Sequence, residues 1–136
     1  MENETKRYLQ VILETLQEQG TAWRIPGLAD RIDQNTQEVL RPESPAIGQH
    51  FFSILDVMRK QDDIRRVPGV SDAIKRIAQE LDRPDSFTTK HYVLSILEIM
   101  RVQQRHYPVT GLSDRIERMI REVNGLGPFM EGANQA

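Results

Sequence analysis

The side chains that could transfer protons or bind metal ions are three histidines and 20 acidic residues, and cysteine is absent. Without cysteine, disulfides, thiolate nucleophiles and cysteine-bound zinc or iron–sulfur sites are excluded. His50 and His91 precede aromatic residues, and no HExxH stretch pairs a histidine with a carboxylate at metal-ligand spacing. We therefore expect these histidines to face solvent or to cap helices, and we predict no metal site.

Patterns typical of catalysis are also missing. Neither a GxSxG nucleophile turn nor a GxxxxGK phosphate loop occurs in the chain. Most carboxylates fall on polar helix faces, where Asp56 and Glu98 precede Arg59 and Arg101 by three residues as helical ion pairs. An acid–base pair would need two carboxylates in one cleft, and nothing singles out two of them. The sequence predicts a non-enzymatic protein without a cofactor.

One six-residue pattern occurs three times, at residues 25–30 (IPGLAD), 67–72 (VPGVSD) and 109–114 (VTGLSD). Its glycines are 42 residues apart; they are Gly27, Gly69 and Gly111. Residues 49–83 and 91–125 are identical at thirteen of 35 aligned positions, far more than chance would give. The period indicates three tandem copies of one supersecondary unit, at approximately 7–48, 49–90 and 91–126.

Each copy contains two segments with helical spacing. In the first segments, apolar residues recur at i, i+3, i+4 and i+7; they are Leu9, Ile12, Leu13 and Leu16, then Phe51, Ile54, Leu55 and Met58, then Val93, Ile96, Leu97 and Met100. The second segments repeat the pattern around Ile32, Ile74 and Ile116. The residues between are polar, so each helix has one apolar face.

We therefore predict an all-α fold, in which three tandem αα-hairpins form one domain over residues 1–126. A hairpin cannot bury its apolar faces alone, and three copies are about the minimum for a stacked core. A compact six-helix bundle and a short helical solenoid both fit, and the lack of polar capping repeats favours the bundle. The period lies in the range of about 40–47 residues found in HEAT and armadillo repeats, a similarity of period alone. Residues 127–136 have no periodicity and are predicted to form a flexible tail, whose Phe129 and Met130 could dock on the core or on a neighbour.

The glycine loops have an architectural interpretation. Glycine permits a tight turn or a positive φ angle before the second helix of each copy. Ser71 and Ser113 can act as N-caps, and an aspartate is present in all three copies: Asp30, Asp72 and Asp114. We predict that these aspartates cap the second helices and meet the positive ends of the helix dipoles.

The same loops resemble helix-hairpin-helix DNA-binding motifs, as the stretch VPGVSDAIKRI at residues 67–77 illustrates. In that family a Pro-Gly turn presents backbone N–H groups to a phosphate at a helix N-terminus. Here the second glycine of the motif is replaced by Ala29, Ser71 or Ser113, and the following aspartate would repel a phosphate. Nucleic-acid binding through these loops is therefore the alternative function.

Arginines recur at equivalent positions, by which we mean positions 42 residues apart or twice that distance; they are Arg31 and Arg115, Arg59 and Arg101, and Arg76 and Arg118. If they line one face of a stacked array, they could bind an acidic partner. Trp23 and Tyr107 share another position, where an aromatic residue either covers the edge of the core or anchors a partner. The main prediction is a protein–protein interaction module, such as a small adaptor, regulator or assembly factor. Its partner would be an acidic protein or a second copy of the chain, giving a homo-oligomer.

The overall charge supports a protein partner over nucleic acid. The net charge is −2, from 18 basic and 20 acidic residues, so no global positive field attracts nucleic acid or an anionic membrane. The N-terminal stretch MENETKRYLQ has no signal-peptide core, and no apolar run approaches the roughly 20 residues of a membrane span. We expect a cytoplasmic protein that does not associate with membranes.

Overall fold

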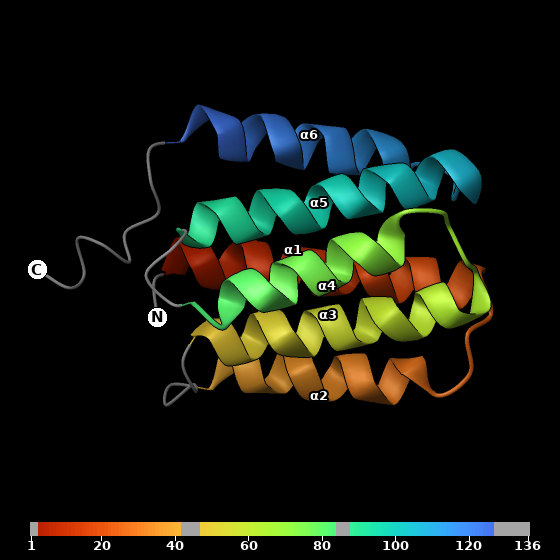
Figure 1. The fold of residues 1–136 in the computed structure, drawn as a ribbon, viewed down its shortest axis with the longest axis horizontal. Helices are drawn as coiled ribbons and strands as arrows, with labels where there is room; N and C mark the ends of the chain where they lie inside the picture. Colours follow the sequence, from red (N-terminus) through yellow and green to blue (C-terminus); the bar gives the residue numbers. More distant parts are fainter. Residues whose placement is uncertain (1–2, 42–46, 84–87, 127–136) are drawn as a thin grey trace, which may run out of the picture.

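Six α-helices and no strand are present in the parts of the chain that the computed structural model describes, residues 3–41, 47–83 and 88–126. The helices are α1 (Asn3–Ala22), α2 (Leu28–Leu40), α3 (Ile47–Ile64), α4 (Val70–Leu81), α5 (Thr89–His106) and α6 (Leu112–Gly125) (Figure 1). The all-α prediction is confirmed. The tail predicted at residues 127–136, with Phe129 and Met130, lies outside the described residues.

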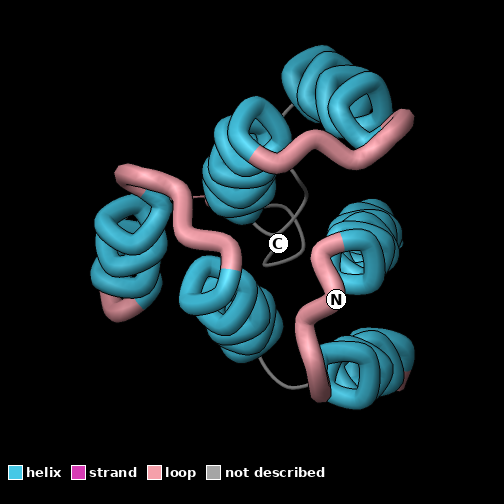
Figure 2. Tube along the Cα trace, turned by 90° about the vertical axis from the view of Figure 1, so that its right-hand side faces the viewer, coloured by secondary structure: helices cyan, strands magenta, loops and turns pink. Residues whose placement is uncertain are grey.

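The helices pack in pairs, α1 with α2, α3 with α4, and α5 with α6. Figure 2 shows the helices nearly end-on, as three pairs joined by short loops around a common centre. Contacts between α6 and α1 bring the first and last described helices together, since Arg7 Nη2 lies 3.1 Å from Glu122 Oε1 and Arg115 is paired with Glu18. The molecule is therefore compact, as favoured from the sequence, and is not an open solenoid.

The core consists of the apolar faces that the spacing predicts. The central residues of α1, α3 and α5 are almost entirely buried, including Leu9, Ile12, Phe51, Ile54, Val93 and Ile96, each at most 1% exposed. The helices α2, α4 and α6 contribute fewer buried residues and cover the outside. Burial of each such side chain is worth about 1.5–3 kcal/mol relative to exposure, so the inner helices dominate the stability of the fold.

The three glycine turns have the positive φ angles that the sequence suggested. Gly27, Gly69 and Gly111 have φ values of 74°, 87° and 81°, and each is the N-cap of the following helix. This left-handed conformation is readily accessible only to glycine. The prediction that aspartates cap these helices is wrong, because no cap residue makes a side-chain hydrogen bond.

The aspartates lie three residues after the N-cap glycines, too far along the chain to be caps. Asp30, Asp72 and Asp114 are the third residues of α2, α4 and α6, and all three are exposed. Their carboxylates still face the positive end of the helix dipole, which favours them by about 0.3–1 kcal/mol each. The glycines thus define where the helices begin, and the aspartates contribute a smaller electrostatic effect.

In each loop a backbone N–H donates a hydrogen bond to the end of the preceding helix. The N–H groups of Val67 and Val109 donate to Asp62 Oδ1 at 3.0 Å and Gln104 Oε1 at 2.7 Å. At the equivalent place the N–H of Ile25 donates to the carbonyl of Gly20 at 3.0 Å. The chain therefore turns at fixed points, and this determines which faces of adjacent helices meet.

Buried glutamines meet where α1, α3 and α5 converge. Gln19 Nε2 donates to Gln61 Oε1 at 2.8 Å and to Gln103 Oε1 at 3.1 Å, and these residues are 42 residues apart. Gln104 Nε2 donates to Gln19 Oε1 at 2.8 Å, and all four side chains are at most 3% exposed. Because buried amides are stable only when they are hydrogen-bonded, this glutamine cluster holds the three inner helices in one alignment.

Candidate functional site

Two of the repeated arginines form ion pairs between adjacent helix pairs. Arg31 on α2 is paired with Asp56 on α3, and Arg115 on α6 is paired with Glu18 on α1. Arg59 lies 3.8 Å from the same Asp56, three residues earlier on its own helix. These arginines have intramolecular partners, so binding to an external acidic protein would have to displace them.

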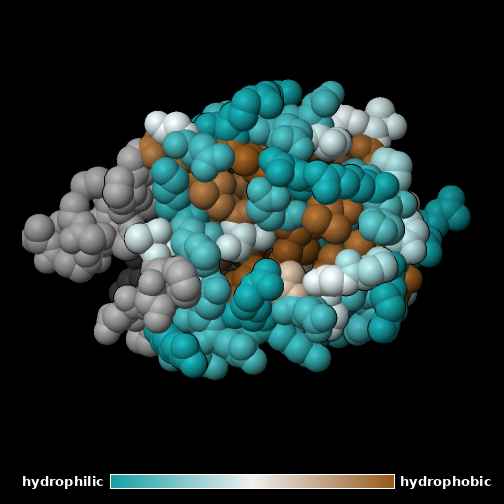
Figure 3. Space-filling view, turned by 45° about the horizontal axis from the view of Figure 1, so that its top comes forward, coloured by the Kyte–Doolittle hydropathy of each residue, from teal (hydrophilic) through white to brown (hydrophobic). Residues whose placement is uncertain are grey.

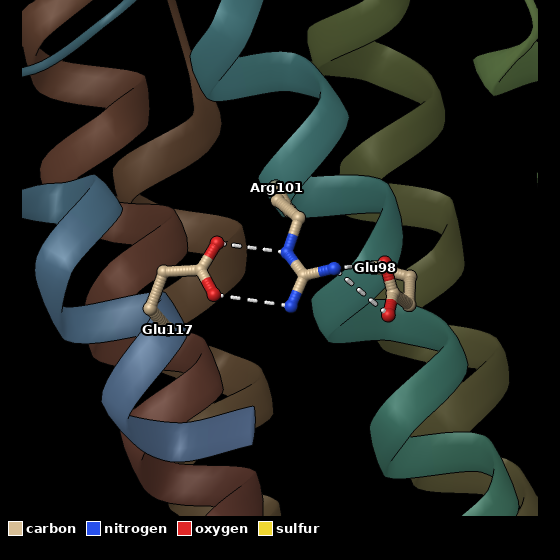
Figure 4. Close-up of polar contacts among 3 residues, drawn as sticks. All are labelled: Glu98, Arg101 and Glu117. Atoms are coloured by element: carbon tan, nitrogen blue, oxygen red, sulfur yellow. Dashed lines mark hydrogen bonds and ion pairs between the residues drawn. The ribbon is translucent and has the colours of Figure 1, made fainter. Parts of the chain in front are cut away.

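Arg101 is also engaged within the molecule (Figure 4). Its Nη1 donates to both carboxylate oxygens of Glu98, at 3.1 Å and 3.2 Å. On the opposite side, its Nε lies 2.8 Å from Glu117 Oε2 and its Nη2 donates to Glu117 Oε1 at 3.1 Å. This two-point contact joins α5 to α6 and leaves Arg101 in a structural position.

The remaining pair of arginines differs from the others. Arg76 on α4 and Arg118 on α6 are exposed, and neither forms an ion pair within the described ranges. Arg76 also lines the groove described below, whereas Arg118 does not. Among the arginines predicted as partner-binding residues, Arg76 therefore combines exposure and a place in the groove with the absence of an ion pair in the described ranges.

The predicted aromatic anchors lie together at the loop end of the bundle. Trp23 is 5% exposed, and its Nε1 donates to the backbone carbonyl of Tyr107 at 3.1 Å. The two rings meet edge to face with centroids 5.7 Å apart, and Tyr107 remains 37% exposed. Trp23 thus covers the edge of the core, one of the two roles expected from the sequence, and only Tyr107 presents substantial surface to a partner.

The three histidines differ in position, and His106 is exposed as expected. His50 is buried, at 3% exposure, which contradicts the prediction of a solvent-facing or capping residue. Burial lowers the pKa of His50, although the carboxylate of Glu38 opposes this effect. His91 Nε2 lies 2.9 Å from Glu80 Oε1 and joins α5 to α4. No cluster of metal-ligating residues occurs in the described ranges.

A groove with a volume of about 390 Å³ lies between α4 and α5. Apolar residues form its floor; they are Val70, Ala73, Ile77, Ile99 and Val102. Pro68 and Gly69 of the loop close one end, and the His91–Glu80 pair lies at the other. Figure 3 shows this side of the molecule, where apolar side chains gather in hollowed surface between polar ridges.

A smaller hollow of about 280 Å³ lies at the equivalent place between α2 and α3. All six of its lining residues have counterparts in the α4–α5 groove, 42 residues later. Three of these counterparts change the chemistry, one of them by replacing the neutral Gln34 with Arg76. Arg31 becomes Ala73, and Asn35, which donates to the carbonyl of Ser53 at 3.5 Å, becomes Ile77. The salt bridge of Arg31 across the first hollow therefore has no equivalent in the second.

The boundary between α6 and α1 resembles the α2–α3 boundary in being crossed by a salt bridge. Arg115 has the position equivalent to Arg31 and Ala73, and it too is paired with an acid of the adjacent helix. Two of the three boundaries are thus crossed by an arginine, and the third has an alanine over an apolar floor. The α4–α5 groove thus differs from the α2–α3 hollow in having Ala73 and Ile77 where the hollow has Arg31 and Asn35.

Sequence reasoning missed the residues that form the groove. The sequence singles out none of Ala73, Ile77, Ile99 and Val102 as a binding residue, because it does not show which helices lie next to each other. The sequence nevertheless contains a signal for the groove, because Ala73 stands where the two other copies have Arg31 and Arg115. The buried glutamines at positions 19, 61 and 103 carried a similar signal, because polar residues there follow the 42-residue period.

No protein-family model matches this chain, and no similar curated protein or solved structure was found. None of the helices described is both long enough and apolar enough to cross a membrane. The functional argument therefore depends on the geometry of the α4–α5 groove.

Proposed function

We propose that this chain is a non-enzymatic protein–protein interaction module, a cytoplasmic adaptor, regulator or assembly factor that binds a segment of a partner protein in the α4–α5 groove. One observation carries the proposal: the groove is an open apolar hollow on a molecule whose corresponding α2–α3 boundary is crossed by a salt bridge. Peptide segments bind such surfaces by burying alternate or helically spaced apolar side chains.

The proposal includes the repeat architecture. Three copies of one 42-residue αα-hairpin would arrange α1, α3 and α5 inside and α2, α4 and α6 outside. The glutamine cluster and the equivalent ion pairs support this arrangement. A ring of three like units would then have three like boundaries, and a single altered boundary would provide one binding site per molecule.

The lining of the groove indicates the kind of segment it would accept. A floor of aliphatic side chains favours aliphatic or aromatic anchors, and the volume of about 390 Å³ has room for two or three of them. Arg76 at the rim has no internal partner in the described residues and would meet an acidic residue of the segment. The acidic partner expected from the sequence is thus retained in the proposal for one arginine, Arg76.

Nucleic acid is the less favoured ligand. The exposed aspartates Asp30, Asp72 and Asp114 lie in the first helical turns, where a phosphate would have to approach. Titration with duplex and single-stranded DNA at low salt should give no binding, because a phosphate contact would be strongest there. A salt-dependent DNA complex would favour the alternative over the groove.

The proposal can be tested by selecting peptides from a phage-displayed random library on the full chain. We expect the selected peptides to lose at least about tenfold in affinity with Ala73→Arg, which places an arginine across the groove as in the two other boundaries. The matched control is Ala29→Arg, which adds the same charge at an exposed position of α2 away from the groove. Equal binding to wild type and to Ala73→Arg would contradict the proposal.

A second copy of the chain is another conceivable occupant, and sedimentation distinguishes it. If the groove binds another copy, the wild type should dimerise with increasing concentration and Ala73→Arg should not. A monomer at all concentrations, together with peptide binding, supports a separate partner protein.

A further inference from the structure

We infer that the segment bound in the α4–α5 groove carries an arginine that pairs with Glu98, in the place that the chain's own Arg31 has beside Asp56 at the α2–α3 boundary. The inference rests on the proposed function and adds a charged residue of defined position to the partner. It follows from comparing the acids at equivalent positions.

Asp56, at the α2–α3 boundary, has an arginine neighbour from each of the two helices. It has two arginine neighbours, Arg59 three residues later on α3 and Arg31 from α2 across the boundary. Arg31 reaches Asp56 Oδ2, and Arg59 lies near Oδ1 at 3.8 Å. One arginine thus comes from the same helix and one from the helix opposite.

Glu98 is the equivalent acid in the α4–α5 groove, and it has only the first of these neighbours. Arg101, equivalent to Arg59, donates to both of its oxygens. Across the boundary stands Ala73, which is equivalent to Arg31 and has no charge. Glu98 lines the groove, and its side chain remains 54% exposed, so a further cation can approach it.

The local charge balance favours this approach. Arg101 is shared between Glu98 and Glu117, so this group of three side chains has one more negative than positive charge. An arginine from a partner would neutralise the excess and could form the same fork-shaped contacts with a carboxylate. The apolar floor beside Ala73 would cover its methylene groups.

The partner segment therefore has a recognisable composition. It presents an arginine toward Glu98. Beside this arginine it has aliphatic residues that pack against Ile77, Ile99 and Val102. The segment also carries an acidic residue that pairs with Arg76. This acidic residue is about one helical turn, measured along α4, from the segment's arginine, because Arg76 follows Ala73 by three residues. A mixed-charge amphipathic segment fits this groove better than a uniformly acidic one.

The test uses the peptides selected on the full chain that lose affinity with Ala73→Arg. Each arginine is replaced by citrulline, which has a similar shape but no charge, and affinity is measured by calorimetry. We expect one replacement to weaken binding about fivefold to wild type, as for a partly exposed ion pair. The same replacement should have almost no effect on binding to Glu98→Gln, because the charge partner is then absent.

The control is Glu14→Gln, which removes the acid at the equivalent position of α1. With this variant, citrulline should still weaken binding about fivefold, as in wild type. Groove-binding peptides without an arginine, or a citrulline effect that persists in Glu98→Gln, would overturn the inference and leave the proposed function intact. If no selected peptide is sensitive to Ala73→Arg, both fail.

Discussion

At the scale of single residues, the glutamine cluster is the least replaceable polar feature of the molecule. Gln19 gives both N–H groups of its amide to Gln61 and Gln103 and accepts one from Gln104. A buried amide without a partner is destabilising by about 1–3 kcal/mol. The hydrogen bonds of Gln19 therefore offset the cost of burying these amides, and Gln103 Nε2 is left buried without a partner in the described part of the chain.

Replacement of Gln19 by leucine should lower the free energy of unfolding by about 2–3 kcal/mol, because the amides of Gln61, Gln103 and Gln104 lose their shared partner. Urea denaturation followed by circular dichroism measures this change. The control is Gln37→Leu at an exposed position of α2, where we expect a change within about 0.5 kcal/mol. An equal effect of both substitutions would mean that the cluster is not stabilising.

His50 should make stability depend on pH. Burial lowers its pKa from the ordinary value of 6.5, so the folded state favours the neutral ring. Its stabilising contribution is complete above 6.5 and is lost as the pH falls through that value toward the lower folded-state pKa. Among its neighbours, Glu38 opposes the shift and Lys6 adds to it.

The thermal midpoint of wild type should accordingly fall more between pH 7 and pH 5 than that of His50→Asn, which cannot take up the proton. His106→Gln removes an exposed histidine instead and should retain the wild-type pH dependence. If wild type and His50→Asn change equally over this pH range, protonation of His50 does not control stability.

At the scale of the elements, the glycine turns determine where the outer helices begin. Gly69 has a φ angle of 87°, and a side chain added there would meet nothing within 4 Å. Any penalty for alanine at this position therefore comes from the backbone conformation and not from crowding.

Gly69→Ala should lower the free energy of unfolding by about 1–2 kcal/mol, the cost of a left-handed conformation for an L-residue. Gly48→Ala is the matched control, because this glycine lies within α3 and also has open space around it. Alanine at position 48 should be neutral or stabilising by up to about 1 kcal/mol. A smaller loss for Gly69→Ala than for Gly48→Ala would contradict this account of the turn.

The elements themselves were predictable from the sequence, whereas the groove was not. The faces around Ile12, Ile54 and Ile96 follow from helical periodicity, which is a local property. The groove requires α4 to lie beside α5, and that depends on packing across the whole chain. Asp72 illustrates a third case: its residue type suits a cap, but the left-handed Gly69 takes the N-cap position and leaves the aspartate inside the helix.

At the scale of the whole molecule, the contacts between α6 and α1 close the arrangement of helix pairs. Arg7 and Tyr8 at the start of α1 both approach Glu122 near the end of α6, at 3.1 Å and 3.4 Å. The first and last described helices are therefore neighbours. The start of α1 and the end of α6 are thus close enough to be joined by a linker.

A circular permutant should therefore fold. Joining the present termini with a flexible linker and opening the chain between α2 and α3 preserves the six helices and their contacts. We expect wild-type helix content by circular dichroism and a single cooperative thermal transition. Opening the chain within α3 is the control and should abolish cooperative unfolding. Non-cooperative melting of the first permutant would mean that the α6–α1 contact does not replace a chain connection.

The burial of the glutamine amides also affects how hydrogen exchanges with solvent. Gln19, Gln61 and Gln103 are fully enclosed, and their donors lie between three helices from different parts of the chain. Their side-chain protons can exchange with deuterium only when these helices separate. The bonded amide signals in a nuclear magnetic resonance spectrum would thus decay slowly, and their protection would measure the free energy of the opening that separates these helices.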